Sequence, residues 1–165
     1  MPVIGNCVSA PTKNFKLPAA VIIPGERIVG TLEVPGDKSI SHRVAIFSAL
    51  SQGPSDIIGF LQSEDCINTL RALESLGVES VMNSEGEVHL VGTGGLFSEP
   101  ANPLDCGNSG TGMRLLAGLV AGQPFPVEMR GDDSLQKRPM DRICLPLERM
   151  GCQFKFLSRK GFAPF

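Results

Sequence analysis

Three segments of this chain combine fixed cations with glycine and small polar residues, a composition suited to binding small anions. They are residues 34–43, 105–114 and 132–140. The first two each follow a predicted strand and lead into an apolar helical stretch, so that backbone N–H groups and a helix N-terminus meet a cation. Phosphates and carboxylates bind at such places. The sequence therefore predicts a site for a small molecule with several negative groups.

The first segment places Lys38-Ser39 at a strand-to-helix turn, as a phosphate-binding loop does. It lacks the G-x-x-x-x-G-K-[ST] spacing of a Walker A motif. Lys38 would supply a point charge and Ser39 a hydroxyl donor. Arg43, one helical turn later, is expected on the same side and could bind an anion with two N–H groups. The alternative is that Ser39 only caps the helix and both cations are solvated.

The second and third segments repeat this combination. Residues 107–112 allow the backbone to approach a ligand closely, and Arg114 follows in the first helical turn. A cation there opposes the helix dipole unless an anion binds at the same end. Arg138 precedes Pro139, which we expect in the first turn of another helix. The alternatives are a capped turn at 107–112 and a solvated basic pair at Lys137 and Arg138, but three basic helix starts together favour an anion site.

Other reactive side chains have simpler explanations. His42 could be a general base, but beside cations it is better explained as a polar neighbour that supports the loop. Cys106 has no recognisable partner base, so a buried structural thiol is favoured over a nucleophile. Asp105 is expected to orient its loop by hydrogen bonding. The five cysteines show no C-x-x-C pair and the two histidines lie far apart, so we expect reduced thiols, no metal site and no cofactor.

Composition excludes several classes of protein. The chain has 165 residues, 42% of them hydrophobic and 19% charged, which is enough for a packed core. The net charge of −2 argues against nucleic-acid binding. The sequence has no apolar run long enough to span a membrane and no signal-peptide core within the first 20 residues, so we expect a cytoplasmic protein. Residues 1–26 are interpreted as an N-terminal tail, with an organellar transit peptide as the weaker alternative.

The hydrophobic pattern predicts an α/β fold built from two similar units. The predicted strands are residues 27–34, 56–61, 125–130 and 153–157, with a hairpin at 78–82 and 88–91. The predicted helices are residues 39–50, 63–76, 111–120 and 138–150. Leu-Glu-Ser-Leu-Gly at 73–77 matches Leu-Glu-Arg-Met-Gly at 147–151, and Arg43 and Arg114 take equivalent places, so the repeat has a period of about seventy residues.

These segments resemble the signatures of the 5-enolpyruvylshikimate-3-phosphate synthase family. Residues 32–43 (Leu-Glu-Val-Pro-Gly-Asp-Lys-Ser-Ile-Ser-His-Arg) resemble the first signature and residues 107–114 (Gly-Asn-Ser-Gly-Thr-Gly-Met-Arg) the second. Residues 131–140 resemble the third. The resemblance extends over about residues 27–154. It implies an inside-out α/β barrel built from βαβαββ units with helices inside, so residues 27–165 are expected to form a partial enolpyruvyl transferase domain, with the second domain absent.

The resemblance also implies an activity. The family transfers the enolpyruvyl group of phosphoenolpyruvate to the 5-hydroxyl of shikimate 3-phosphate and releases phosphate, a step of chorismate and aromatic amino-acid biosynthesis. Lys38, Ser39 and Arg43 would bind shikimate 3-phosphate, and Lys38 would be the catalytic residue. The residues implied to bind phosphoenolpyruvate are Lys38, Asn108, Gly110, Thr111, Arg114 and Arg138. No cofactor is implied, the partners are the two small substrates, and the full-length protein is expected to be a monomer.

The chain also departs from the family. Members are more than twice as long, and this sequence stops before their acid–base residues, so we expect a fragment that is inactive alone. Gly112 and Leu115 stand where many members have alanine and proline, whereas Gly110 leaves room for the inhibitor glyphosate. The alternatives are a non-catalytic anion-binding remnant and a UDP-N-acetylglucosamine enolpyruvyl transferase-like enzyme. The second is disfavoured because residues 38–43 follow the shikimate pattern.

Overall fold

The computed structural model describes residues 29–165, so the proposed tail at 1–26 and the first two residues of the strand predicted at 27–34 lie outside it. The chain divides into two units, Met1–Glu33 and Val34–Phe165. Residues 29–37 form no regular secondary structure, and the strand prediction is wrong over 29–34. Apolar alternation makes a strand only where a neighbouring strand can pair with it, and these residues pair with none in the described chain.

The first half of the second unit contains two helices and an antiparallel sheet. Its elements, in chain order, are α1 (Lys38–Leu50), β1 (Gln52–Ile57), α2 (Glu64–Ser75), β2 (Glu79–Met82) and β3 (Val88–Thr93). The sheet order is β1-β3-β2, and β3 is antiparallel to both neighbours. The helices predicted at 39–50 and 63–76 and the hairpin are therefore confirmed.

Strand β1 begins four residues earlier than the strand predicted at 56–61 and ends at Ile57, so the prediction is wrong over 58–61. Gly53 and Pro54 lie inside β1 and pair with Gly92 and Val91. Because β1 is an edge strand, the missing N–H of Pro54 does not interrupt a central ladder.

The second half contains shorter strands. Its elements are β4 (Leu104–Asp105), α3 (Gly110–Val120), β5 (Met129–Arg130), the 3₁₀ turn η1 (Leu135–Lys137) and α4 (Asp141–Arg149). Strands β4 and β5 pair in parallel, with α3 as their crossover. The helix at 111–120 is confirmed, whereas only the last two residues of the strand predicted at 125–130 are paired.

Helix α4 starts after the position predicted for it, so Pro139 does not occupy its first turn. Arg138 has φ −91° and ψ 132°, an extended conformation, and it ends the turn η1. The ring of a proline disfavours helical angles in the residue before it, which explains why no helix includes Arg138. The third basic segment is therefore not a helix start, and its cations do not oppose a helix dipole.

The strand predicted at 153–157 is absent. These side chains do alternate between exposed and half-buried, but no ladder forms along them. The rings of Phe154 and Phe156 instead pack against Phe165, with centroids 5.5 and 6.0 Å away. The edge of β5 is occupied by Phe165, which exchanges two backbone hydrogen bonds with Met129. The sequence pattern correctly indicated a segment with one half-buried side, but it did not show that Phe165, and not this segment, pairs with β5.

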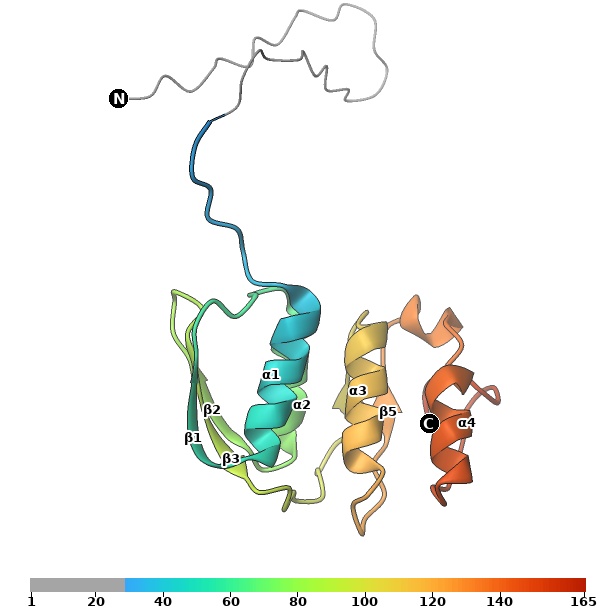
Figure 1. The fold of residues 1–165 in the computed structure, drawn as a ribbon. Coiled ribbons are helices and arrows are strands. Elements are labelled where there is room, and N and C mark those ends of the chain that lie inside the picture. The colour runs from blue at the N-terminus through green and yellow to red at the C-terminus, as the bar shows by residue number, and fades with distance from the viewer. Residues whose placement is uncertain (1–28) are drawn as a thin grey trace, which may run out of the picture. The chain divides into compact units, whose positions relative to one another are not determined.

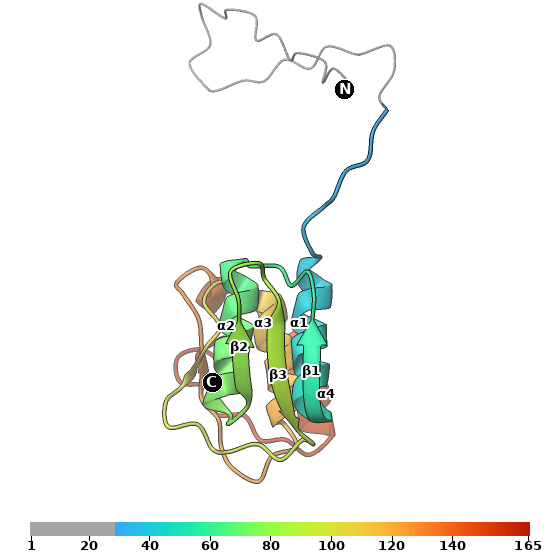
Figure 2. The ribbon, with the colours of Figure 1, turned by 90° about the vertical axis from the view of Figure 1, so that its left-hand side faces the viewer.

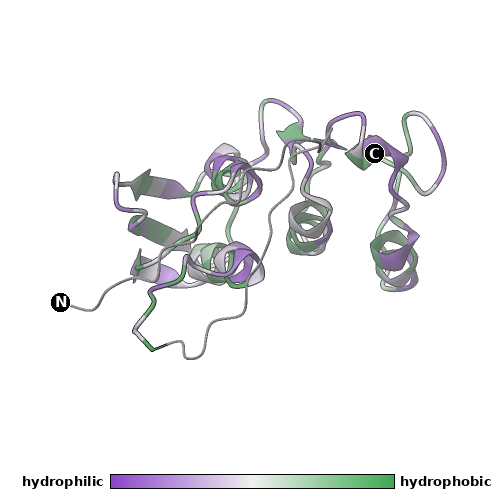
Figure 3. Cartoon of the chain, turned by 90° about the horizontal axis from the view of Figure 1, so that it is seen from above, coloured by the Kyte–Doolittle hydropathy of each residue, from purple (hydrophilic) through white to green (hydrophobic). Residues whose placement is uncertain are grey.

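Helices α1 and α2 pack against one face of the larger sheet, and α3 and then α4 lie on the side of these helices away from the sheet (Figures 1 and 2). Helix α1 contacts β3, α2 and α3, and α3 contacts α4. Helix α3 is hydrophobic along most of its length, whereas α4 has one hydrophobic and one hydrophilic side (Figure 3). The largest fully buried side chains come from both halves, among them Leu73, Leu90, Met113 and Leu116. The two halves therefore share one core.

The predicted repeat is clearest where α2 and α4 end. Gly77 and Gly151 have φ of +91° and +103°, the left-handed conformation that ends a helix. In α2 the N–H of Val78 donates to the carbonyl of Leu73, and in α4 the N–H of Cys152 donates to the carbonyl of Leu147. The matching sequences at 73–77 and 147–151 thus build the same helix end twice.

Candidate anion-binding site

The first basic segment forms the N-terminus of α1. Asp37 is the N-cap, and its side chain accepts a hydrogen bond from the backbone N–H of Ile40 at 2.8 Å. Lys38 follows, and its Nζ donates to Asp65 Oδ2, at the start of α2, at 2.9 Å. This bond raises the pKa of Lys38, so the ammonium stays charged. Lys38 remains half-exposed, with donors left for a ligand.

The second segment forms the N-terminus of α3. Asp105 accepts the N–H of Gly107 at 2.9 Å, which confirms that this carboxylate orients the loop. Ser109 is the N-cap, and its Oγ accepts the N–H of Gly112 at 3.0 Å. A Cβ placed on Gly110 would lie 3.1 Å from Arg114 and 3.6 Å from Arg138, at one guanidinium nitrogen of each. The backbone of Gly110 therefore lies directly against two cations.

The third segment is joined to the second by hydrogen bonds. The N–H of Asp132 donates to the carbonyl of Gly107 at 2.8 Å. Its carboxylate accepts the side-chain amide of Asn108 at 2.7 Å and the N–H of Leu135 at 2.7 Å. These bonds, the one from Asn108 first, lower the pKa of Asp132. The carbonyl oxygen of Asn108 then accepts a bond from Arg138 at 2.6 Å.

Arg114 holds the segments together. One guanidinium nitrogen donates to the carbonyl of Gly110 at 3.0 Å and the other terminal nitrogen to the carbonyl of Pro139 at 3.1 Å. The side chain thereby ties the first turn of α3 to the residue that follows Arg138. This geometry suits a residue that shapes a pocket better than one that takes up an anion with both terminal nitrogens.

The predicted residues fall into a close group and two outliers. Lys38 and Arg138 lie near enough that Arg138 opposes the rise in the pKa of Lys38, and Asn108, Gly110 and Arg114 surround Arg138. Thr111 is exposed beside them. Ser39 is exposed on the first turn of α1, and Arg43 donates to its carbonyl at 3.0 Å. In residues 29–165 no hydrogen bond links Arg43 to the group around Arg138.

Arg43 instead borders a shallow apolar hollow of about 470 Å³ on the outer side of α1, with Ile40, Val44 and Phe47. It lies five positions after Lys38, which on a helix with 3.6 residues per turn puts the two side chains on different sides. Its guanidinium would have to leave the Ser39 carbonyl to reach an anion bound at Lys38.

His42 and Cys106 are both buried. His42 bonds to Thr69 and Ser109 inside the protein, in agreement with a supporting role. Burial raises the pKa of the Cys106 thiol to about 12, so it carries almost no thiolate at neutral pH. A buried structural thiol is the interpretation that this environment supports.

Three residues of the site were not found by sequence reasoning. Asp65 was seen only as part of the start of a helix, Asp132 as a member of the third motif without a role, and Thr69 not at all. Each gains its role from a partner 24 to 27 positions away in the chain. The sequence offered a signal only for Asp132, which stands in the same segment as Arg138.

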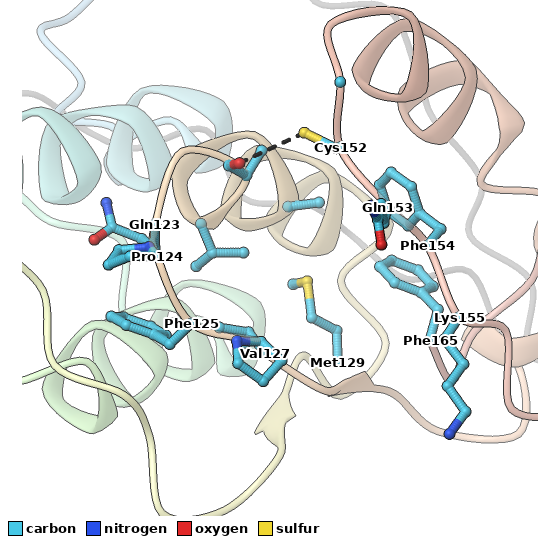
Figure 4. A pocket seen from close by; sticks show the side chains of 15 residues that line it. Gln123, Pro124, Phe125, Val127, Met129, Cys152, Gln153, Phe154, Lys155 and Phe165 are labelled. Carbon is cyan, nitrogen blue, oxygen red and sulfur yellow. Dashed lines mark hydrogen bonds between the residues drawn. The ribbon is translucent and has the colours of Figure 1, made fainter.

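An apolar hollow lies away from these cations. It has a volume of about 550 Å³ between the end of α3 and residues 151–155 (Figure 4). Phe125, Met129, Phe154 and Phe165 give it an apolar lining, to which Lys155 contributes the single charged side chain. Within residues 29–165, no group of three or more His, Cys, Asp or Glu side chains is placed to hold a metal ion. Among the described helices, none combines the length and hydropathy that a membrane crossing requires.

Comparisons with known proteins agree on one family. The family model described as EPSP synthase (3-phosphoshikimate 1-carboxyvinyltransferase) matches residues 22–165. Relatives named 3-phosphoshikimate 1-carboxyvinyltransferase include that of Akkermansia muciniphila, 53% identical over 142 residues, and that of Nitrosococcus oceani, 54% identical over 136 residues. These alignments cover 82% and 81% of this chain, but only 33% and 30% of the relatives.

The solved EPSP synthase from Acinetobacter baumannii is 46% identical, with a TM-score of 0.77, and the match covers 82% of this chain and 31% of that one. The mixed helix and sheet arrangement is thus the enolpyruvyl transferase fold in part. The chain spans about a third of the length of the curated relatives that it matches. The family model, the relatives and the solved structure together show that the chain belongs to the EPSP synthase family.

Proposed function

We propose that this chain supplies the anion-binding half of an enzyme that transfers the enolpyruvyl group of phosphoenolpyruvate to shikimate 3-phosphate. Lys38, Ser39 and Arg43 bind shikimate 3-phosphate in this proposal, and Lys38 also faces phosphoenolpyruvate. Asn108, Gly110, Thr111, Arg114 and Arg138 form the phosphoenolpyruvate pocket. The full-length protein acts as a monomer on these two small molecules in the cytoplasm.

The observation that carries the proposal is that Arg138 and Arg114 both lie against Gly110 at the N-terminus of α3, while Lys38 lies at the N-terminus of α1, a helix that contacts α3. Both substrates are anions that repel each other, and interposed cations allow them to lie close together. Holding two reactants in contact removes much of the entropic barrier of a two-substrate reaction. The fixed cations also stabilise charge on the tetrahedral species through which an addition to phosphoenolpyruvate passes.

The hydrogen bonds of the two arginines suggest different roles for them in the pocket. Arg138 is held by Asn108 and keeps further donors for a ligand, whereas both terminal nitrogens of Arg114 donate to backbone carbonyls. We therefore assign direct contact with phosphoenolpyruvate to Arg138 and Lys38, and a shaping role to Arg114. Arg43 reaches shikimate 3-phosphate after release from the Ser39 carbonyl.

Two-dimensional NMR of the ¹⁵N-labelled chain tests the proposal directly. Shikimate 3-phosphate should shift the amide signals of residues 38–43, and phosphoenolpyruvate those of residues 108–112. Lys38→Ala should weaken both responses, whereas Lys155→Ala, on the distant apolar hollow, should weaken neither. Absence of both responses in the unsubstituted chain would contradict the proposal.

UDP-N-acetylglucosamine tests the alternative activity in the same titration. The relatives are named for the shikimate reaction, which does not favour that alternative. A response at residues 38–43 to UDP-N-acetylglucosamine and not to shikimate 3-phosphate would reverse the assignment.

A further inference from the structure

A buried row of polar side chains runs between the first two basic segments. His42 lies on α1 and is fully buried, with Thr69 on α2 at one ring nitrogen and Ser109 on α3 at the other. The distances are 2.8 Å from Nδ1 to Thr69 Oγ1 and 3.3 Å from Nε2 to Ser109 Oγ. Thr69 and Ser109 are 1% and 2% exposed. Three helices thus meet at one imidazole that water does not reach.

The neighbours of this row determine which way its protons point. Ser109 Oγ already accepts the N–H of Gly112, so its own proton is free to point at His42 Nε2. Thr69 donates its proton to the carbonyl of Asp65 at 3.4 Å, so its oxygen is free to accept from His42. All these bonds are satisfied together when the proton of a neutral imidazole sits on Nδ1.

We propose that His42 is a positioning residue, which as the Nδ1–H tautomer fixes the two anion-binding loops relative to each other. One end of the row is the N-cap of α3, next to Gly110. The other end is the backbone of Asp65, whose side chain holds Lys38. The row therefore connects the loop that lies against Arg138 to the residue that positions the lysine. This inference rests on the proposed function, because it assigns the row to the spacing of two anion sites.

Burial and the nearby cations together keep the His42 ring neutral, although one nearby carboxylate acts in the opposite direction. Burial lowers the pKa of His42, Asp65 on α2 opposes that change, and Lys38 and Arg43 on α1 reinforce it. A doubly protonated ring would require two acceptors. Ser109 would then have to turn its own proton away from the ring, although no other buried acceptor is bonded to it in the described chain.

The first test measures the tautomer in the unsubstituted 165-residue chain. A long-range ¹H–¹⁵N spectrum separates protonated from unprotonated ring nitrogens, and a His89→Gln variant removes the signals of the other histidine. We expect a protonated Nδ1 and an unprotonated Nε2, the reverse of the tautomer that free histidine prefers in water. An Nε2–H ring, or a mixture like that of free histidine, would overturn the proposal.

The second test asks whether the row couples the loops. Thr69→Val keeps the shape of the side chain and removes the acceptor, and Thr69→Ser is the matched control that keeps it. Thr69→Val should move the His42 proton to Nε2 and speed hydrogen exchange at the Gly112 amide about tenfold, the effect of one lost hydrogen bond. Thr69→Ser should leave both unchanged. Equal behaviour of the two variants would exclude coupling through His42.

Titration with inorganic phosphate separates this inference from the proposed function. In the unsubstituted chain phosphate should shift the amides of residues 38–40 and 110–112, and Thr69→Val should weaken the response at 110–112 several-fold. If phosphate leaves the unsubstituted chain unchanged while the Nδ1–H tautomer and the effect of Thr69→Val persist, the row still positions the loops and the proposed function fails. If phosphate binds equally to both Thr69 variants, the row has no bearing on the anion site.

Discussion

Lys38 combines three properties that a group serving two anions requires. It is charged, half-exposed and held by one carboxylate at 2.9 Å, which leaves two of its three N–H donors for ligands. Cys106, in the neighbouring loop, has the opposite character because burial raises its pKa to about 12. The two residues therefore provide a contrast between a ligand-facing and a purely structural side chain.

In a hybrid enzyme that joins this segment to the remaining two thirds of a relative, Lys38→Ala should abolish turnover and Cys106→Ala should retain most of it. The lysine contacts both substrates in the proposed site, whereas the thiol has no thiolate to offer. Steady-state phosphate release measures both variants. A Cys106→Ala enzyme that is folded but inactive would contradict the assignment.

Asn108 links Asp132 to Arg138 by two hydrogen bonds of 2.7 and 2.6 Å. In the same hybrid, Asn108→Ala should raise KM for phosphoenolpyruvate about tenfold, the effect of losing a hydrogen bond to a charged group, with a smaller change for shikimate 3-phosphate. Asn102→Ala, at an exposed loop position, is the matched control. Equal changes in both KM values would indicate a general loss of structure and not a loosened Arg138.

The glycines that end α2 and α4 share a backbone conformation but differ in the space around them. Gly77 and Gly151 both adopt positive φ, but a Cβ on Gly77 would lie 2.9 Å from Ser98 Oγ, whereas nothing lies within 4 Å of a Cβ on Gly151. Gly151→Ala should therefore lower the free energy of unfolding by about 1–2 kcal/mol, the cost of left-handed backbone alone. Gly77→Ala should cost about 1 kcal/mol more because of the contact.

Urea denaturation of both variants checks this order. Adding Ser98→Ala to Gly77→Ala should recover part of the extra cost, because Oγ is removed while the Cβ of residue 98 stays 3.3 Å from the new Cβ. If the two glycine variants are equally destabilised, the contact with Ser98 is relieved by a movement that the structure does not anticipate.

Elements were predictable where the signal was local. The helices at 39–50, 63–76 and 111–120 have apolar periodicity and N-cap residues (Asp37, Ser63 and Ser109) in the local sequence, and the structure contains all three. The strand predictions over the described residues 29–34 and over 153–157 were wrong because a strand also needs a partner, which the local pattern does not specify. The start of α4 was misplaced because the effect of Pro139 on Arg138 outweighed its suitability for a first helical turn.

The candidate site was predictable in its cations and loops but not in its acids. Lys38, Asn108 and Arg138 stand in recognisable motifs, whereas Asp65 and Asp132 act through contacts that only the fold creates. Arg43 stands in a motif too, yet its described contact is with its own helix. The motifs therefore located the site, but the hydrogen-bond partners of its cations became known only from the structure.

At the scale of the whole chain, burial of His42 makes stability depend on pH. Because burial lowers the pKa of the folded ring below its ordinary 6.5, the unfolded chain takes up the proton first as the pH falls. The contribution to stability is complete above pH 6.5 and is lost toward the lowered pKa, at up to about 1.4 kcal/mol per pH unit.

Chemical denaturation between pH 8 and 5 should therefore show stability falling below about pH 6.5. The variant His42→Gln should show a flatter profile in this range, since its side chain does not titrate. Asp132, whose pKa is lowered from 3.8, contributes only in more acidic solution and does not confuse the comparison. Parallel profiles for the two proteins would show that His42 is not the group responsible.

The isolated 165-residue chain should have no measurable synthase activity. The reaction requires a base for the 5-hydroxyl proton and an acid for the phosphoenolpyruvate methylene, each typically worth ~10²–10⁴-fold. The family resemblance places these groups outside this segment, and an open site leaves its cations screened by solvent. Phosphate release with both substrates is the measurement. Release above that of a Lys38→Ala control would show that the catalytic groups lie within these residues.

The pairing of Lys38 with Asp65 also affects how strongly the proposed site attracts simple inorganic anions. The carboxylate cancels much of the field of the ammonium, and Asp132 does the same near Arg138 through Asn108. A chloride ion, which binds through its charge alone, gains little where the positive potential is reduced in this way. A phosphate ester gains several directed hydrogen bonds at once. In the proposed site, we therefore expect the acids that accompany the cations to favour phosphate esters over simple salts.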